Sequence, residues 1–366
     1  MMRTQLKYAI IVSATAITLV AAHSWASVKF GTVTYQNEKE IVIPTWPDLL
    51  DTKEYDKRML ELAGYVPPVP VSPTTTPASP LQYSSTTNVT ISGKQWPAAA
   101  VYPNGGAILP FKRIVAYYGN FYSKQMGILG EYEPDEVLRR LEVEKAQWEA
   151  ADQTTPVQLA IEYIAIVAQS VAGADGMYRA VMPDSEIEKA YALAQKAGAI
   201  LILDIQPGLS TLEKELPKFR KYLMRPDVHI AIDPEFSMKD GSRPGKVIGT
   251  VDAKDVNYVV DYMSEIVKEY KLPPKVLLVH RFTEKMVTNS DAIDPTAEVQ
   301  VIMVMDGWGS KDLKRGTYSH IIEPEPVQFT GVKIFYKNDM RPPSTGIFTP
   351  AEVLELHPKP IFIQYQ

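Results

Sequence analysis

Short apolar runs, separated by amphipathic stretches, form the main pattern of this sequence from residue 113 onward. Runs that are apolar at nearly every position are typical of strands buried on both faces, as in a parallel sheet. The pattern therefore predicts eight parallel strands. They are Ile114–Tyr118, Ile161–Ala168, Ala199–Asp204, Val228–Asp233, Lys275–His280, Val299–Met305, Val332–Tyr336 and Pro360–Gln364.

Amphipathic segments between these runs predict helices. The clearest are Asp135–Ala150, Ser185–Ala197, Leu209–Leu223, Ala253–Tyr270 and Thr349–Leu356. Pro183-Asp184-Ser185 is a helix start, and Gly198 is a helix end directly before a strand. Eight strand–helix units in about 260 residues match the size of a (β/α)8 barrel, also called a TIM barrel. An open doubly wound α/β sheet would alternate similarly, but no glycine-rich dinucleotide motif follows the first strand.

The first residues have the pattern of a secretion signal. Arg3 and Lys7 precede the uncharged stretch Tyr8–Ala22, and Ser24-Trp25-Ala26 fits a cleavage site. An uncleaved membrane anchor is the alternative, although this stretch is shorter than the ~20 residues that span a bilayer. We therefore expect a secreted or periplasmic protein.

A proline-rich stretch follows further along. Val66–Pro80 holds six prolines in fifteen residues, with Ser and Thr between them, which favours an extended linker over a packed core. Before it, a strand at Glu40–Pro44 and a helix at Asp48–Leu62 are expected. The predicted segments are a signal peptide at 1–26, a short amino-terminal segment at 27–65, a Pro/Ser/Thr-rich linker at 66–106 and the barrel at 107–366.

Composition excludes several classes of protein. The 366 residues include no cysteine, which rules out disulfide scaffolds, zinc-thiolate and iron–sulfur sites, and a cysteine nucleophile. The net charge of −5 argues against nucleic acid as a partner, because nucleic-acid binders usually carry a basic face. The loop Gly241–Lys246 is not a phosphate loop, because it has three residues between its glycines where four are needed. No cofactor is expected.

Polar and aromatic residues follow almost every predicted strand. Barrel enzymes place their chemistry at the carboxyl ends of the strands, so these residues are candidates for a site. The alternative is that strand ends simply meet water and that Asp residues cap the following helices. The candidate substrate-binding residues are Tyr118, Gln169, Tyr178, Gln206, His280, Trp308 and Tyr336.

The segment Asp233-Pro234-Glu235 is the sharpest candidate for catalysis. Residues two apart on a strand point to the same side, so Asp233 and Glu235 are expected to project together into the barrel mouth. Neighbouring carboxylates shift each other's pKa, which suits a general acid beside a charged partner. We expect Glu235 as the general acid, Asp233 as its charged partner, and Asp204 or Asp306 as the base, the nucleophile or an orienting group. In the structural alternative, Asp233 caps the next segment and Glu235 pairs with Arg243 or Lys246.

Several motifs resemble a group of exported, largely uncharacterised bacterial (β/α)8 proteins that are glycoside-hydrolase-like. Asp233-Pro234-Glu235 and Val304-Met305-Asp306 also resemble, more weakly, chitinase-like barrels, in which such a Glu is the acid and the Asp orients the sugar. The resemblance covers residues 113–366 and implies the barrel fold and export. The motifs are Tyr117-Tyr118-Gly119, Met126–Glu131, Asp175–Tyr178, Asp204–Gly208, Asp233-Pro234-Glu235, Val247–Asp252, Leu277–His280 and Asp306–Gly309.

These observations predict a barrel that cleaves a cell-surface or extracellular polysaccharide by carboxylate acid/base catalysis. Carbohydrate is the expected partner, since aromatic faces stack on sugar rings. Two alternatives stay open. One is a glycan-binding barrel without catalysis, and the other is a phosphodiesterase-type hydrolase whose divalent metal is bound by Asp204, Asp233, Glu235, Asp306 and His280.

Overall fold

The computed structural model describes residues 32–34, 40–42, 49–64 and 96–366. The predicted signal peptide and most of the predicted linker lie outside the described residues. The chain divides into two units, residues 1–47 and 48–366. In the first unit, β1 (Thr32–Thr34) and β2 (Glu40–Val42) form an antiparallel pair.

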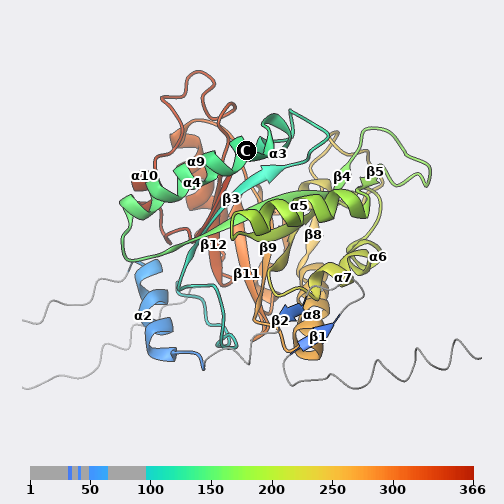
Figure 1. The fold of residues 1–366 in the computed structure, drawn as a ribbon. Coiled ribbons are helices and arrows are strands. Elements are labelled where there is room, and N and C mark those ends of the chain that lie inside the picture. Colours follow the sequence, from blue (N-terminus) through green and yellow to red (C-terminus); the bar gives the residue numbers. More distant parts are fainter. Residues whose placement is uncertain (1–31, 35–39, 43–48, 65–95) are drawn as a thin grey trace, which may run out of the picture. The chain divides into compact units, whose positions relative to one another are not determined.

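The second unit contains a closed barrel of eight parallel strands, as the sequence predicts (Figure 1). Pairing of the last barrel strand with the first, where Phe362 lies opposite Ile114, closes the sheet. The strands are β3 (Arg113–Gly119), β4 (Val157–Ala168), β6 (Ile200–Ile205), β7 (Val228–Ile232), β9 (Lys275–Arg281), β11 (Val299–Met305), β12 (Phe329–Ile334) and β13 (Phe362–Tyr365).

Three short strands lie outside this closed ring. β5 (Arg179–Val181) pairs antiparallel with the end of β4 and forms a hairpin at the barrel rim. β8 (Val251–Asp252) and β10 (Val287–Thr288) form a separate parallel pair.

The long helices match the predicted pattern closely. α4 (Pro134–Ala151), α5 (Asp184–Lys196) and α8 (Ala253–Tyr270) each pack an apolar face on the outside of the barrel. Gly198 adopts a φ of +60° just after α5, which explains why that helix ends there. α10 (Pro350–Leu354) is shorter than predicted. α2 (Thr52–Leu62) packs against the apolar cluster inside the barrel.

The predicted helix Leu209–Leu223 is not continuous. It consists of α6 (Leu212–Glu215), a 3-10 turn (Leu216–Phe219) and α7 (Arg220–Leu223). Pro217 contributes to the interruption, because it lacks the backbone N–H that would bond to the carbonyl four residues earlier in an α-helix. Two helices were not predicted: α3 (Ile128–Glu131), and α9 (Lys311–Thr317), which continues as a π-helical turn (Tyr318–Ile322). No helix of the described residues is long and apolar enough to cross a membrane.

Strand residues alternate between two apolar clusters. One set packs outward against the helices, and the other fills the barrel interior. This double burial explains why the strands are apolar at nearly every position. The interior set includes Ile114, Ala116, Ala160, Ile200, Ile202, Ala231, Val276, Leu278, Ile302, Val304 and Phe362.

Candidate active site

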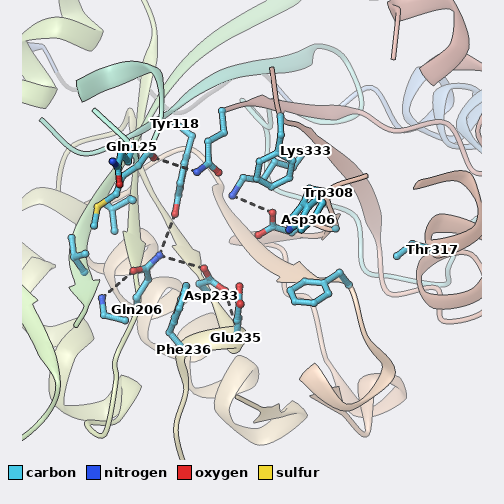
Figure 2. Close-up of a pocket in the computed structure, with 18 of the residues that line it drawn as sticks. Tyr118, Gln125, Gln206, Asp233, Glu235, Phe236, Asp306, Trp308, Thr317 and Lys333 are labelled. Carbon is cyan, nitrogen blue, oxygen red and sulfur yellow. Dashed lines mark hydrogen bonds and ion pairs between the residues drawn. The ribbon is translucent and has the colours of Figure 1, made fainter. Parts of the chain in front are cut away.

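A pocket of about 450 Å³ opens at the carboxyl ends of the barrel strands (Figure 2). Every one of the eight barrel strands contributes at least one lining residue from its end or from the loop that follows. In strand order these include Tyr118, Ala168, Gln206, Asp233, Phe282, Asp306, Phe335 and Gln366. Glu235, Phe236, Trp308 and Lys333 line the same pocket.

The polar residues of the site continue the inward-facing positions of the strands. Two residues beyond Ala116, Ala160, Ile202, Leu278 and Val304, the interior changes from apolar to Tyr118, Glu162, Asp204, His280 and Asp306. Because side chains alternate along a strand, these residues point to the same side as the apolar interior set. The barrel interior therefore has an apolar lower part and a charged upper part.

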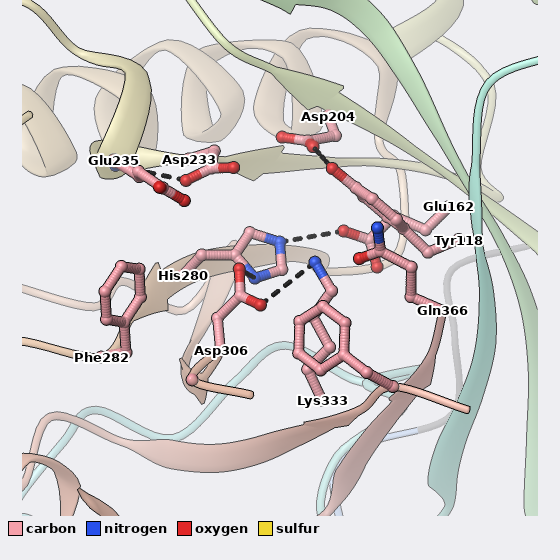
Figure 3. Close-up of polar contacts among 12 residues, drawn as sticks. Tyr118, Glu162, Asp204, Asp233, Glu235, His280, Phe282, Asp306, Lys333 and Gln366 are labelled. Carbon is pink, nitrogen blue, oxygen red and sulfur yellow. Dashed lines mark hydrogen bonds and ion pairs between the residues drawn. The ribbon is translucent and has the colours of Figure 1, made fainter. Parts of the chain in front are cut away.

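Asp306 lies between two cations (Figure 3). Lys333 Nζ is 3.1 Å from its Oδ1, and His280 Nδ1 is 3.3 Å from its Oδ2. The same ammonium lies 4.0 Å from the centre of the Tyr118 ring. Lys333 is 4% exposed, so these contacts are made largely away from water. Asp306 is thus held in place by charge on both oxygens.

His280 lies beneath the pocket and has no exposed surface. Its Nε2 is 3.0 Å from Glu162 Oε1, so each ring nitrogen faces a carboxylate. Burial lowers the pKa of His280, but Asp306 and Glu162 outweigh it and raise the pKa to about 9. The ring is therefore an imidazolium at neutral pH, and this second buried cation supports Asp306.

A second chain of contacts runs from Asp204 to Asp233 (Figure 2, Figure 3). The Tyr118 hydroxyl donates a hydrogen bond to Asp204 at 2.8 Å. Gln206 Nε2 donates hydrogen bonds to the Tyr118 hydroxyl at 3.3 Å and to Asp233 at 3.4 Å. Burial raises the pKa of Asp204 to about 7, with His280 opposing this shift and Glu162 adding to it. Burial, together with the nearby Asp204, also raises the pKa of Asp233 well above its usual value.

Asp233 and Glu235 stand on a tight turn directly after β7. The 3-10 turn Pro234–Phe236 begins there, and Asp233 accepts a hydrogen bond from the Glu235 backbone N–H at 3.2 Å. Asp233 thus has the capping role of the structural alternative, and both side chains also line the pocket. In the described part of the chain, neither Arg243 nor Lys246 forms an ion pair with Glu235. Burial raises the pKa of Glu235, and the charge of Asp306 raises it further.

Not all candidate residues from the sequence come together. Tyr118, Gln206, Asp233, Glu235, Asp306 and Trp308 line the pocket, and Asp204 and His280 lie directly behind it. Gln169, Tyr178 and Tyr336 do not line it. Gln169 and Tyr178 lie in the hairpin between β4 and β5, and Tyr336 stacks on Tyr365 and donates to Glu144 at 2.5 Å. Side chains along a strand point alternately to its two faces, so a polar residue at the end of a strand does not necessarily point into the barrel.

Two charged members of the site were not predicted from the sequence. Glu162 lies inside the second apolar run and Lys333 inside the seventh. Burying a charged side chain costs free energy unless it has a partner, so a charged residue inside an apolar run indicates a paired, buried site. The rule that barrel sites lie at strand ends does not select either residue, because both lie before the end of their strand.

Comparisons with known proteins gave only distant structural likeness. No known protein family matches the sequence, and no curated protein does. Among solved structures, a Bacillus subtilis mannanase is similar at 12% identity and a TM-score of 0.35, over 70% of this chain and 79% of that chain. Another structure of a Bacillus subtilis mannanase is similar at 11% identity and a TM-score of 0.35, over 70% and 81% of the two chains.

Proposed function

We propose that this protein is a glycoside hydrolase in which Glu235 is the general acid and Asp306 is the charged carboxylate. The observation that carries the proposal is the contrast between these two groups in one pocket. Burial raises the pKa of Glu235, whereas Asp306 contacts two cations. A carboxyl group that can give up a proton, beside a second carboxyl group paired with cations, is the arrangement that glycosidic cleavage requires.

The division of roles follows from the contacts. Glu235 has no ion-pair partner in the described part of the chain, so its carboxyl group is available to protonate a leaving oxygen. Asp306 stabilises positive charge that develops on the sugar ring or activates the attacking group. Lys333 and His280 hold Asp306 in position, and Asp233 braces the turn that carries Glu235.

The pocket walls suit a sugar. Phe236, Phe282, Trp308 and Phe335 line it together with the carboxyl groups, and Trp308 is 53% exposed. An aromatic face beside hydrogen-bonding groups matches a pyranose ring, which has apolar C–H faces and a polar edge. Export, expected from residues 1–26, would place this activity on an extracellular or cell-surface polysaccharide.

The buried groups favour this proposal over a metal-dependent hydrolase. Glu162, Asp204 and His280 each offer one ligand atom, and these atoms lie within 4.8 Å of one another. Both ring nitrogens of His280 already face carboxylates, Nε2 at 3.0 Å from Glu162 and Nδ1 at 3.3 Å from Asp306. These contacts favour an imidazolium that pairs with carboxylates.

A reducing-end release screen against cell-wall glycans and exopolysaccharides tests the proposal. Glu235→Gln should lower turnover by about 100-fold or more and leave glycan binding intact, because the substitution removes only the proton to be transferred. Glu355→Gln, an exposed change directly after α10, is the matched control and should have no effect. Turnover that survives Glu235→Gln but is abolished by a chelator would refute the proposal. Glycan binding without any release would favour a non-catalytic barrel.

A further inference from the structure

A second pocket of about 360 Å³ adjoins the first. Gln125, Phe335 and Gln366 line both pockets, so the two form neighbouring parts of one depression at the barrel mouth. A chain of sugar rings bound in the first pocket can therefore extend into the second.

The second pocket is cationic. Lys124, Lys337 and Arg341 line it, with Glu131 as the one acidic lining residue. Lys337 pairs with Glu131 at 2.7 Å, which leaves two cations in excess. Neither Lys124 nor Arg341 has an ion pair among the residues that the structure describes. This excess of positive charge contrasts with the net charge of −5 of the whole chain.

Arg341 connects this charge to the first pocket. Its guanidinium lies over the ring of Trp308, 5.4 Å from the ring centroid, and Trp308 lines the first pocket. Stacking of this kind positions the planar group while its N–H donors stay available, and their spacing matches the two oxygens of a carboxylate.

The first pocket has the opposite character. Asp233, Glu235 and Asp306 line it, and Lys333, the one cation among its lining residues, is paired with Asp306. A carboxylate on the sugar in this pocket would lie beside three carboxyl groups and no unpaired cation. An acidic sugar is therefore disfavoured in the first pocket and favoured in the second.

We propose that the second pocket is a subsite for an acidic sugar, such as a uronic acid, and that a neutral sugar occupies the first pocket. The substrate class is then a heteropolysaccharide in which an acidic unit stands beside the neutral unit whose bond is cleaved. The cleavage part of this inference rests on the proposed function, whereas the binding part does not.

Calorimetric binding of two matched oligosaccharides tests the subsite. One alternates glucuronate with a neutral hexose, and the other is its carboxyl-reduced form, which has the same rings without the charge. Binding is measured with Glu235→Gln, so that no turnover occurs, and release is measured with the wild type. The acidic form should bind about 5- to 10-fold more tightly, as expected for two exposed charge pairs, and the preference should shrink as salt is added.

Lys124→Gln with Arg341→Gln should abolish that preference. Lys112→Gln with Lys359→Gln is the matched control, since it removes the same charge next to the starts of β3 and β13 and should leave the preference intact. Equal affinity for both oligosaccharides, or a preference that survives the first pair of changes, would overturn the subsite. A charge-dependent preference without any release would support the subsite and count against the proposed hydrolysis.

Discussion

Asp204→Asn should make the protein more stable at alkaline pH. The Asp204 side chain has no exposed surface, and its Oδ1 has no hydrogen-bond partner among the described residues. Burial raises its pKa from 3.8 to about 7. Between these values the folded state keeps a proton that the unfolded chain releases, so this group's contribution to stability falls as pH rises from about 4 to 7.

The size of the effect follows from the shift. A difference of roughly three pKa units, at 1.36 kcal/mol each, amounts to about 4 kcal/mol of stability lost by pH 8. Asparagine has nearly the same shape, does not titrate, and still accepts the hydrogen bond from Tyr118. The free energy of unfolding of Asp204→Asn, relative to wild type, should therefore rise by about 4 kcal/mol between pH 4 and pH 8.

Urea unfolding of both proteins at unit steps from pH 4 to pH 8 measures this difference. Asp306→Asn is the control, because it removes the carboxylate from two buried cations and should destabilise by about 3–5 kcal/mol at neutral pH. If the stability of Asp204→Asn relative to wild type were constant or fell toward pH 8, the argument from burial would be refuted.

Three further predictions concern the supporting structure. Glu162→Gln removes one of the two carboxylates that face His280 and should lower the His280 pKa from about 9, which an NMR titration of the ring would detect; an unchanged titration would contradict the assignment. In the wild-type protein, protonated His280 makes its full contribution to the free energy of unfolding below about pH 6.5, and this contribution is lost as pH rises through about 9. Gly208→Ala should lower the Tm, because φ is +63° and a Cβ would lie 2.4 Å from the Met177 carbonyl oxygen; an unchanged Tm would show that the loop adjusts freely. Met263→Ala, in the buried face of α8, should cost about 2–5 kcal/mol in urea unfolding, and a loss under 1 kcal/mol would mean the cavity collapses.

Much of the fold could be predicted because a strand or helix that is buried in the protein has a recognisable order of apolar residues along its own sequence. Each barrel strand is covered on both faces, so each appears as an apolar run, and all eight predicted strands are present. α8 begins and ends at the predicted residues, since a capping box fixes its start. The prediction of one continuous helix at Leu209–Leu223 was wrong in the middle of that range. It rested on the amphipathic pattern, which is the same whether or not a proline such as Pro217 interrupts the helix.

The candidate site could be predicted only in part. The rule that barrel sites lie at strand ends led to Asp233, Glu235 and Asp306, which share the pocket. The same rule selected Tyr336, which faces Glu144 outside this pocket, because the rule does not specify the direction of a side chain. It also overlooked Glu162 and Lys333, which lie within strands.

The sequence by itself determined the number of strands, their burial and the set of polar residues near their ends, because these depend on neighbours along the chain. Only the tertiary structure decided which charges meet. Closing the barrel brings Glu162 to within 3.0 Å of His280, although 118 residues separate them. The protonation of His280 and Asp204 depends on such contacts and on the loss of water around them. Electrostatic energies depend on distance in space and on burial, and neither is written in the order of the residues.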